Sequence, residues 1–247
     1  MPNEKSVPMS AIILAGGKSK RMGTDKAFLR YSGHTFISLI TEQLLRISDD
    51  LVVAIGKKDR RTFESELVAD KRLLLINDDP YIDNPLGGML SAFGRVKNEY
   101  AFVTACDSPL PKLDVAKYLY NVARSHSAAV PVWEEDDVLT SEPLIAVYNV
   151  EQTKTAILHA MKRNMMGCKR ILSLLTDTKY VSVKDLRNFD PTLTSLLNIN
   201  IRQDYHRLEE NCDIPRLSQS MFLPELKNDA ASRDMSVIAR AGDRLVG

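Results

Sequence analysis

Two adjacent glycines and a cluster of cationic side chains stand near the beginning of the chain. Gly16 and Gly17 follow an uncharged apolar run, residues 11–15, and within the next nine residues come four cations, Lys18, Lys20, Arg21 and Lys26. Glycine allows a sharp turn and close approach to a ligand, and successive N–H groups in such a turn form a nest for an anion. The pattern predicts a phosphate-binding loop at the carboxyl end of a buried strand. A solvated basic turn is the alternative interpretation.

Two common phosphate-binding motifs are excluded. The Walker motif requires a glycine five positions before the Gly-Lys-Ser of residues 17–19, and Ile12 stands there. A Gly-x-Gly-x-x-Gly string is absent from the sequence. A phosphate-binding role of this loop would therefore have to rest on a different motif.

Alternating apolar segments indicate how this loop is positioned. Helical spacing of apolar residues predicts helices at 34–47, 111–125, 150–163 and 168–175, and another after residue 89. Short apolar runs predict strands at 11–15, 51–55, 72–76, 100–106, 127–132, 142–148 and 180–183. We expect an acidic hairpin tip at 133–137 and a solvated helix start at the cations of 57–61.

One carboxylate stands where a strand meets the predicted phosphate loop. Asp107 follows the strand at 100–106 directly. Mg²⁺ prefers carboxylate and phosphate oxygens and is bound through one or two acids, so this position suits a magnesium ligand. A simple strand-end turn is the alternative.

Composition narrows the function classes. The 247 residues carry a net charge of +1, which provides no overall field for nucleic acid or membrane. The three cysteines are widely spaced, so neither a disulfide framework nor a zinc site is expected. Residues 1–5 lack a signal-peptide pattern and no apolar run approaches a membrane span. We therefore expect a cytoplasmic protein with one domain at 1–212 and a carboxyl-terminal extension at 213–247.

The string Leu14-Ala-Gly-Gly-x-Ser-x-Arg-Met-Gly-x-Asp-Lys-Ala27 closely resembles the signature of nucleoside triphosphate-dependent nucleotidyltransferases. Its Leu-Ala-Gly-Gly form is similar to that of the MobA-like molybdenum cofactor guanylyltransferases. The resemblance covers roughly residues 10–208. It implies an α/β fold, a doubly wound, mostly parallel sheet with helices on both faces, and nucleotide bound across the strand ends.

The family's functional positions map onto this chain residue by residue. Those implied for nucleotide binding are Leu14, Ala15, Gly16, Gly17, Lys26, Asp78, Gly88, Asp107, Asn198 and Asn200, and those implied for catalysis are Arg21, Lys26 and Asp107. Asp107 is the implied Mg²⁺ ligand. Asp78 is placed to accept hydrogen bonds from guanine, with an Asx turn before Pro80 as the alternative.

Asn198 and Asn200 are expected on one face of a strand, pointing into the cleft, although a polar strand edge would explain them equally. Lys169 and Arg170 are candidates for the acceptor phosphate or are solvated. The chain departs from the family pattern at several positions, namely Gly56 for a common Asn, Asn84 for Gly, Glu142 for a common His, and Ile201-Arg202 for Thr-Pro.

The resemblance implies transfer of GMP from GTP to molybdopterin, with Mg²⁺ as cofactor and release of pyrophosphate. It also implies molybdoenzymes or cofactor-delivery proteins as partners and a monomer or homodimer. Two other functions remain open. One is a related transferase that uses CTP or another phosphorylated acceptor, such as a sugar phosphate or phospholactate. The other is a non-catalytic GTP-binding module, against which the presence of Lys26 and Asp107 argues.

Overall fold

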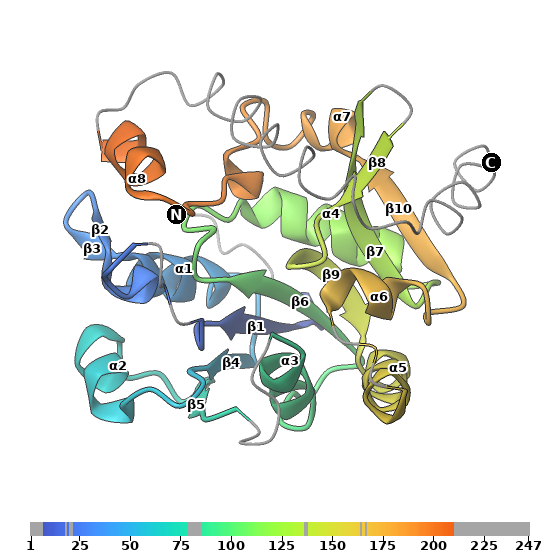
Figure 1. Cartoon of the computed structure of the whole chain (residues 1–247), viewed down its shortest axis with the longest axis horizontal. Coiled ribbons are helices and arrows are strands. Elements are labelled where there is room, and N and C mark those ends of the chain that lie inside the picture. The colour runs from blue at the N-terminus through green and yellow to red at the C-terminus, as the bar shows by residue number, and fades with distance from the viewer. Residues whose placement is uncertain are drawn as a thin grey trace.

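The protein is built on one mixed β-sheet (Figure 1). The computed structural model describes residues 7–17, 19, 22–78, 85–135, 138–163, 165 and 167–209. Over these residues the sheet has eight strands in the order β10–β7–β9–β6–β1–β4–β5, with β8 paired to β7. The strands are β1 (Ser10–Leu14), β4 (Leu51–Ala54), β5 (Leu73–Ile76), β6 (Tyr100–Ala105), β7 (Ala128–Glu135), β8 (Val138–Ser141), β9 (Ile145–Asn149) and β10 (Thr178–Ser182).

Strand direction determines which loops meet. Strands β5, β4, β1 and β6 are parallel, so their carboxyl ends share one edge of the sheet. Strand β9 is antiparallel to both of its neighbours, β6 and β7, while β10 is parallel to β7. The loops after β1, β4, β5 and β6 therefore converge, and ligands of open α/β sheets bind at such an edge.

Helices cover both faces of the sheet. They are α1 (Phe36–Leu44), α2 (Arg60–Glu66), α3 (Pro85–Phe93), α4 (Leu113–Ala123), α5 (Val150–Lys162), α6 (Cys168–Leu172), α7 (Val183–Leu186) and α8 (Arg202–Glu209), with 3₁₀ turns η1 (Lys26–Phe28) and η2 (Thr194–Leu196). Helices α1, α2, α4 and α7 contribute to the apolar cluster on one face, and α3, α5 and α6 to that on the other. The expected doubly wound, mostly parallel α/β fold is confirmed.

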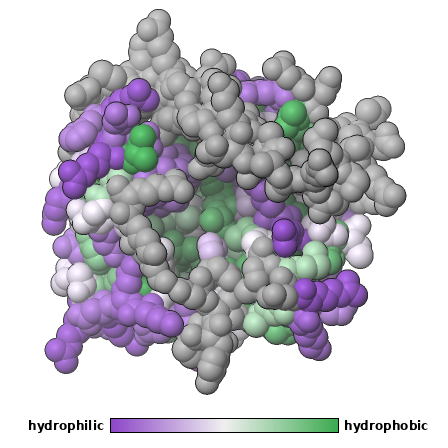
Figure 2. Space-filling model, in the orientation of Figure 1, coloured by the Kyte–Doolittle hydropathy of each residue, from purple (hydrophilic) through white to green (hydrophobic). Residues whose placement is uncertain are grey.

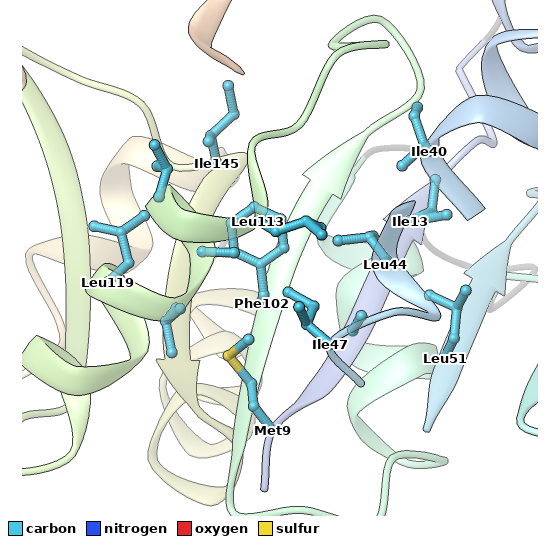
Figure 3. Close-up of a cluster of buried hydrophobic side chains, with 14 of the residues drawn as sticks. Met9, Ile13, Ile40, Leu44, Ile47, Leu51, Phe102, Leu113, Leu119 and Ile145 are labelled. Carbon is cyan, nitrogen blue, oxygen red and sulfur yellow. The ribbon is translucent and has the colours of Figure 1, made fainter. Parts of the chain in front are cut away.

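The residues of β1 show why the sheet is buried on both sides. Ala11 and Ile13 belong to one apolar cluster, and Ile12 and Leu14 to the other. Successive side chains of a strand point to opposite faces, so a strand between two helical layers must be apolar throughout. In Figure 3, Phe102 of β6 lies between side chains of α4 and of α1 in the first cluster.

A third apolar cluster joins α8 to the opposite end of the chain. Leu208 of α8 belongs to one cluster with Met22, Phe36 and Ile199. The hydroxyl group of Tyr205 on α8 also donates to a main-chain carbonyl of the small hairpin formed by β2 (Arg30–Tyr31) and β3 (His34–Thr35), with a distance of 2.8 Å. Helix α8 therefore covers the segment that follows the glycine loop, as its position in Figure 1 shows.

Several local predictions need correction. Residues 197–200 form no strand, although the two asparagines were expected to share a strand face. Residues 133–135, expected in a hairpin tip, continue β7, and the chain returns first as β8 before β9 begins. Helix α6 ends at Leu172 rather than at residue 175. The hairpin β2–β3 was missed because its strands are two residues long, too short for any periodicity.

The surface view, the helix lengths and the carboxyl-terminal residues each bear on an expectation from the sequence. Figure 2 shows hydrophilic residues along the left and lower margins of one face, with apolar residues between them. No helix within the described residues is both long and apolar enough to cross a membrane. The predicted extension at 213–247 lies outside the described residues, so that domain boundary stays a prediction.

Candidate active site

The predicted phosphate loop brings Lys26 against Asp107. The Lys26 ammonium group donates to Oδ2 of Asp107 at 3.2 Å and to Oδ1 of Asn200 at 2.9 Å. The side chains of Lys26 and Asp107 are 13% and 28% exposed, so this ion pair is accessible without being fully solvated. A cation, a carboxylate and an amide from three distant segments thus meet at one point.

Local structure explains why Lys26 faces this point. Asp25 caps η1 by accepting a hydrogen bond from the Ala27 amide, and Lys26 is the first residue of that turn. The Lys26 amide donates to Oγ of Ser19 at 3.1 Å, which closes the loop on itself. Ser19 adopts a φ of 45°, a left-handed conformation that non-glycine residues rarely take. The loop is therefore shaped by its own side chains as well as by its glycines.

The glycine loop leaves main-chain donors available. Gly16 and Gly17 follow β1 after one residue, Ala15, and neither amide meets an acceptor among the described residues. The side chains of Leu14 and Ala15 are buried in the two apolar clusters, so contacts of these residues with a nucleotide would use the main chain. Unpaired N–H groups beside a lysine are suited to an anion.

Residues 198–204 complete the site from the far end of the described chain. The Ile199 amide donates to the carbonyl of Asp107 at 2.8 Å, and the Ser108 hydroxyl donates to Oδ1 of Asn198 at 2.7 Å. Oδ2 of Asp204 accepts from the Asn200 amide at 2.9 Å. Both asparagines therefore reach the site from an irregular segment that hydrogen bonds hold in place. Sequence patterning missed Asp204.

A second part of the site is formed by close contact of three glycines with Asp78. Oδ1 of Asp78 accepts from the Gly56 amide at 2.9 Å. A Cβ atom on Gly16 would lie 2.9 Å from Oδ2 of Asp78, and one on Gly88 would lie 3.1 Å from it. Gly56 has a φ of +66°, and a Cβ there would lie 2.8 Å from Cα of Gly16. The absence of side chains is what allows these segments to meet.

Burial raises the pKa of the Asp78 carboxyl group, because removing a carboxylate from water disfavours its charged form. The hydrogen bond from the Gly56 amide and the positive charge of Lys58 act in the opposite direction and lower it. The net direction is upward. The Asp78 carboxyl group is therefore partly desolvated and accepts a hydrogen bond from Gly56.

Lys58 is the residue that sequence reasoning misjudged most clearly. It was expected in a solvated helix start, but its ammonium group contacts the carbonyl of Ala15 at 2.5 Å and both carboxylate oxygens of Asp25, at 2.8 and 2.7 Å. Helix α2 begins later, after Asp59, whose side chain accepts a hydrogen bond from the Arg61 amide. No local pattern separates Lys58 from the exposed Lys57 beside it.

The donor set around Asp107 fits a magnesium ion. No group of three or more His, Cys, Asp or Glu side chains within the described part of the chain is arranged to hold a metal on its own. Oδ1 of Asp107 meets no donor there, since Lys26 contacts Oδ2. Mg²⁺ is commonly bound by one or two carboxylates together with substrate phosphates and water, so a single free carboxylate oxygen beside a phosphate loop suits it.

Several residues that the sequence singled out are not among the contacts described above. Arg21 and Asn84 lie outside the described residues, so their predicted roles stay predictions. Lys169 and Arg170 are exposed on α6. Glu142 accepts a hydrogen bond from the Trp133 indole at 3.0 Å, which holds the segment before β9 against β7.

The family model described as the MobA-like NTP transferase domain matches residues 11–187, more than half of the chain. The chain belongs to this family. As a MobA-like NTP transferase it is a nucleotidyltransferase, and the glycine loop, Lys26, Asp78 and Asp107 all fall within the matched span. Asn198 and Asn200 lie beyond it.

Curated relatives resemble most of the chain. A probable molybdenum cofactor guanylyltransferase of Methanosarcina acetivorans is 31% identical over 205 residues, an alignment that spans 79% of this chain and 87% of the relative. A molybdenum cofactor guanylyltransferase of Syntrophotalea carbinolica is 31% identical over 198 residues, spanning 80% of this chain and 89% of the relative. Both relatives are therefore named for guanylylation of the molybdenum cofactor.

Solved structures share the fold. Molybdopterin-guanine dinucleotide biosynthesis protein A from Archaeoglobus fulgidus matches with a TM-score of 0.69 at 25% identity, covering 83% of this chain and 98% of that one. The 2-C-methyl-D-erythritol 4-phosphate cytidylyltransferase of Thermus thermophilus matches with a TM-score of 0.63 at 14% identity, covering 84% and 98%. The second likeness concerns the fold alone.

Proposed function

We propose that this protein transfers GMP from GTP to the terminal phosphate of molybdopterin and releases pyrophosphate. The observation that carries the proposal is the meeting of Lys26 and Asp107, at 3.2 Å, in a site whose glycine loop presents the amides of Gly16 and Gly17, which meet no acceptor among the described residues. The names of the relatives, molybdenum cofactor guanylyltransferases at 31% identity, support the choice of donor and acceptor. The protein acts in the cytoplasm, as a monomer or homodimer, and passes its product to molybdoenzymes or cofactor-delivery proteins.

The chemical difficulty of this reaction is the approach of two polyanions. The acceptor phosphate is already ionised and needs no strong base, so catalysis consists of positioning and charge neutralisation. In the proposed mechanism the amides of Gly16 and Gly17 hold the β- and γ-phosphates. Lys26, together with Arg21, neutralises charge that develops on the leaving pyrophosphate.

Asp107 would hold Mg²⁺, since its Oδ1 accepts no hydrogen bond from the described residues while Lys26 contacts Oδ2. When bound, the ion supplies positive charge for the phosphate oxygens, which is the role of divalent ions in phosphoryl-transfer enzymes. The chain's own contribution is to fix Asp107. The Ile199 amide binds its carbonyl and the Lys26 ammonium group binds its Oδ2.

Asp78 recognises the guanine base in this proposal. The Gly56 amide donates to Oδ1, whereas Oδ2 lies against Gly16 and Gly88 and accepts no hydrogen bond from the described residues. A carboxylate oxygen in that position accepts from the N1–H and amino groups of guanine, which adenine and cytosine do not present in the same arrangement. Asn198 and Asn200 are proposed to contribute to nucleotide binding, and they contact Ser108 and Lys26 respectively.

The test incubates the purified protein with Mg²⁺, molybdopterin and each nucleoside triphosphate in turn, and measures pyrophosphate release. Release with GTP, dependent on molybdopterin, is the expected result. Release with CTP in place of GTP would overturn the choice of nucleotide, and release with a sugar phosphate or phospholactate in place of molybdopterin would overturn the acceptor. Binding of GTP without turnover would indicate a non-catalytic GTP-binding module.

A further inference from the structure

Lys58 makes polar contacts that the proposed mechanism does not use. Its ammonium group bonds to the carbonyl of Ala15 and to the carboxylate of Asp25, and the side chains of Lys58 and Asp25 are only 19% and 26% exposed. The group also lies 5.9 Å from the centre of the Phe63 ring of α2. A lysine held by two acceptors and partly desolvated has lost much of its side-chain freedom, which points to a positional role.

The contact with Ala15 controls the direction of the next amide. All peptide bonds of the described residues are trans, and in a trans peptide the carbonyl and the following N–H point to opposite sides. By binding the Ala15 carbonyl, Lys58 turns the Gly16 N–H away from itself. That N–H meets no acceptor among the described residues, so it is presented to an incoming anion.

The contact with Asp25 extends this control to Lys26. Asp25 caps η1, the turn that begins with Lys26, and it is the one acid among the cations of residues 18–26. Without Lys58, this carboxylate would have no ion-pair partner among the described residues, beside a loop that is proposed to bind a polyanion. Lys58 therefore fixes the cap of η1 and also cancels a charge that opposes phosphate binding.

We propose that Lys58 is a positioning residue of the triphosphate site, which aims the Gly16 amide and Lys26 at the phosphates by holding Ala15 and Asp25. This proposal rests on the proposed function for the identity of the anion. Lys58 does not touch the substrate. Its hydrogen bonds go to Ala15 and Asp25, and it reaches Asp78 only through its charge, so its main effect is expected where the phosphates bind.

The test compares Lys58→Met with Lys57→Met, a matched control at the exposed neighbouring lysine. Calorimetry measures binding of GTP and of guanosine, which lacks phosphates. For Lys58→Met we expect the Kd for GTP to rise about tenfold, the scale of one lost hydrogen bond to a charged group, with the Kd for guanosine unchanged. Lys57→Met should match the parent protein in both. Lys58→Arg should recover part of the loss, since Arg retains the charge and the donors.

Equal GTP affinity in the two Met variants would overturn the proposal. So would a parallel loss of GTP and guanosine affinity in Lys58→Met, because that would indicate general damage rather than an effect at the phosphate end. In steady-state assays with GTP as the varied substrate, we expect the KM to rise in Lys58→Met, together with a smaller fall in kcat from misaligned Lys26.

Hydrogen exchange separates this proposal from the proposed function, since it needs no nucleotide. Amides of residues 15–28 should exchange faster in Lys58→Met than in Lys57→Met, with unchanged exchange in the strands of the sheet. Unchanged exchange at residues 15–28 would show that Lys58 does not hold the loop. A parent protein that binds no GTP would overturn the proposed function, and the exchange comparison would still decide whether Lys58 fixes this segment.

Discussion

The two ends of the candidate site are built in opposite ways. The phosphate end is the part that we propose binds the triphosphate, and it contains residues 15–26, Lys58 and Asp107. Charged side chains meet there, Lys26 with Asp107 and Lys58 with Asp25. The base end is the part around Asp78 that we propose binds guanine. Main chain comes into contact with Asp78 there because three residues carry no side chain, namely Gly16, Gly56 and Gly88. The first arrangement tolerates small shifts of position and depends on charge, whereas the second depends on shape. Substitutions at the two ends should therefore fail differently.

The largest effect is expected from loss of charge at the phosphate end. Lys26→Met or Asp107→Asn should lower kcat by about 10²–10³, the scale for removing one preorganised charge-stabilising group. Steady-state pyrophosphate release measures this. The melting temperature should change little, because both side chains are partly exposed and such ion pairs contribute little to stability.

Lys71→Met is a suitable control, since Lys71 is exposed and precedes β5 at the opposite edge of the sheet. Its kcat should equal that of the parent protein. A kcat for Asp107→Asn close to that of Lys71→Met would remove Asp107 from the catalytic machinery.

Substitution of a glycine at the base end should lower the free energy of unfolding. Gly56→Ala combines a positive φ with a Cβ only 2.8 Å from Cα of Gly16. Strain and overpacking together should lower the free energy of unfolding by about 2–4 kcal/mol. Denaturant unfolding of the purified variant measures the loss.

Gly17→Ala provides the matched control for this prediction. A Cβ atom on Gly17 would meet nothing within 4 Å, so its free energy of unfolding should stay within about 0.5 kcal/mol of the parent value. If the two variants lost equal stability, close contact between the glycines would not be what distinguishes the base end.

Asp78→Asn should act on selectivity and on pH dependence. Because the Asn side chain also presents donors to guanine, the preference for GTP over ATP should fall about tenfold. Burial raises the pKa of Asp78, so the folded protein binds this proton more tightly than the unfolded chain does. The carboxyl group therefore favours folding at acid pH, and that contribution declines as pH rises from the ordinary pKa of about 4 through the raised one.

Denaturant titrations at a series of pH values test whether the contribution of Asp78 to the free energy of unfolding falls as pH rises. Relative to the parent protein, Asp78→Asn should gain stability as pH rises across that interval. A relative loss of stability would mean that the Gly56 hydrogen bond and Lys58 outweigh burial.

The smallest effect is expected from thiol-alkylating reagents, because the two cysteines of the described residues lie in or near the core. Burial raises the pKa of Cys106 to about 12 and that of Cys168 to about 11. At pH 8 only about one Cys106 in ten thousand is then a thiolate, so alkylation by iodoacetamide should be very slow in the folded protein. Peptide mass spectrometry after timed labelling, with guanidinium-unfolded protein as control, checks this. Rapid labelling of Cys106 would show that the core below Asp107 is open.

The sequence was sufficient to predict the strands that carry the site. The strands β1, β4, β5 and β6 contain no charged residue and are mainly apolar, with Ser10 and Thr104 as buried polar exceptions, because strands covered on both faces must be largely apolar. Lys26 and Asp107 were predicted from a signature string and from a strand end, and the structure brings them together. Their functional roles stay predictions that the substitutions above address.

What sequence patterning missed depends on contacts between distant segments. Lys58 and Asp25 are 33 positions apart, and nothing near Lys58 distinguishes it from its exposed neighbour Lys57. Asn198 and Asn200 were expected on a strand, but hydrogen bonds to Ser108 and Lys26 hold them in an irregular segment. Periodicity describes only how a segment meets a layer of the core, so it contains no information about such pairings.

The hydrogen bond between Lys26 and Asn200 joins residues 174 positions apart. During translation, the glycine loop, Lys26 and Asp107 leave the ribosome well before Asn200 and the helix that follows it. A nascent chain therefore has the phosphate-binding loop without the amide that holds its lysine. Under the proposed function, we expect tight capture of nucleotide to begin only when synthesis has passed α8.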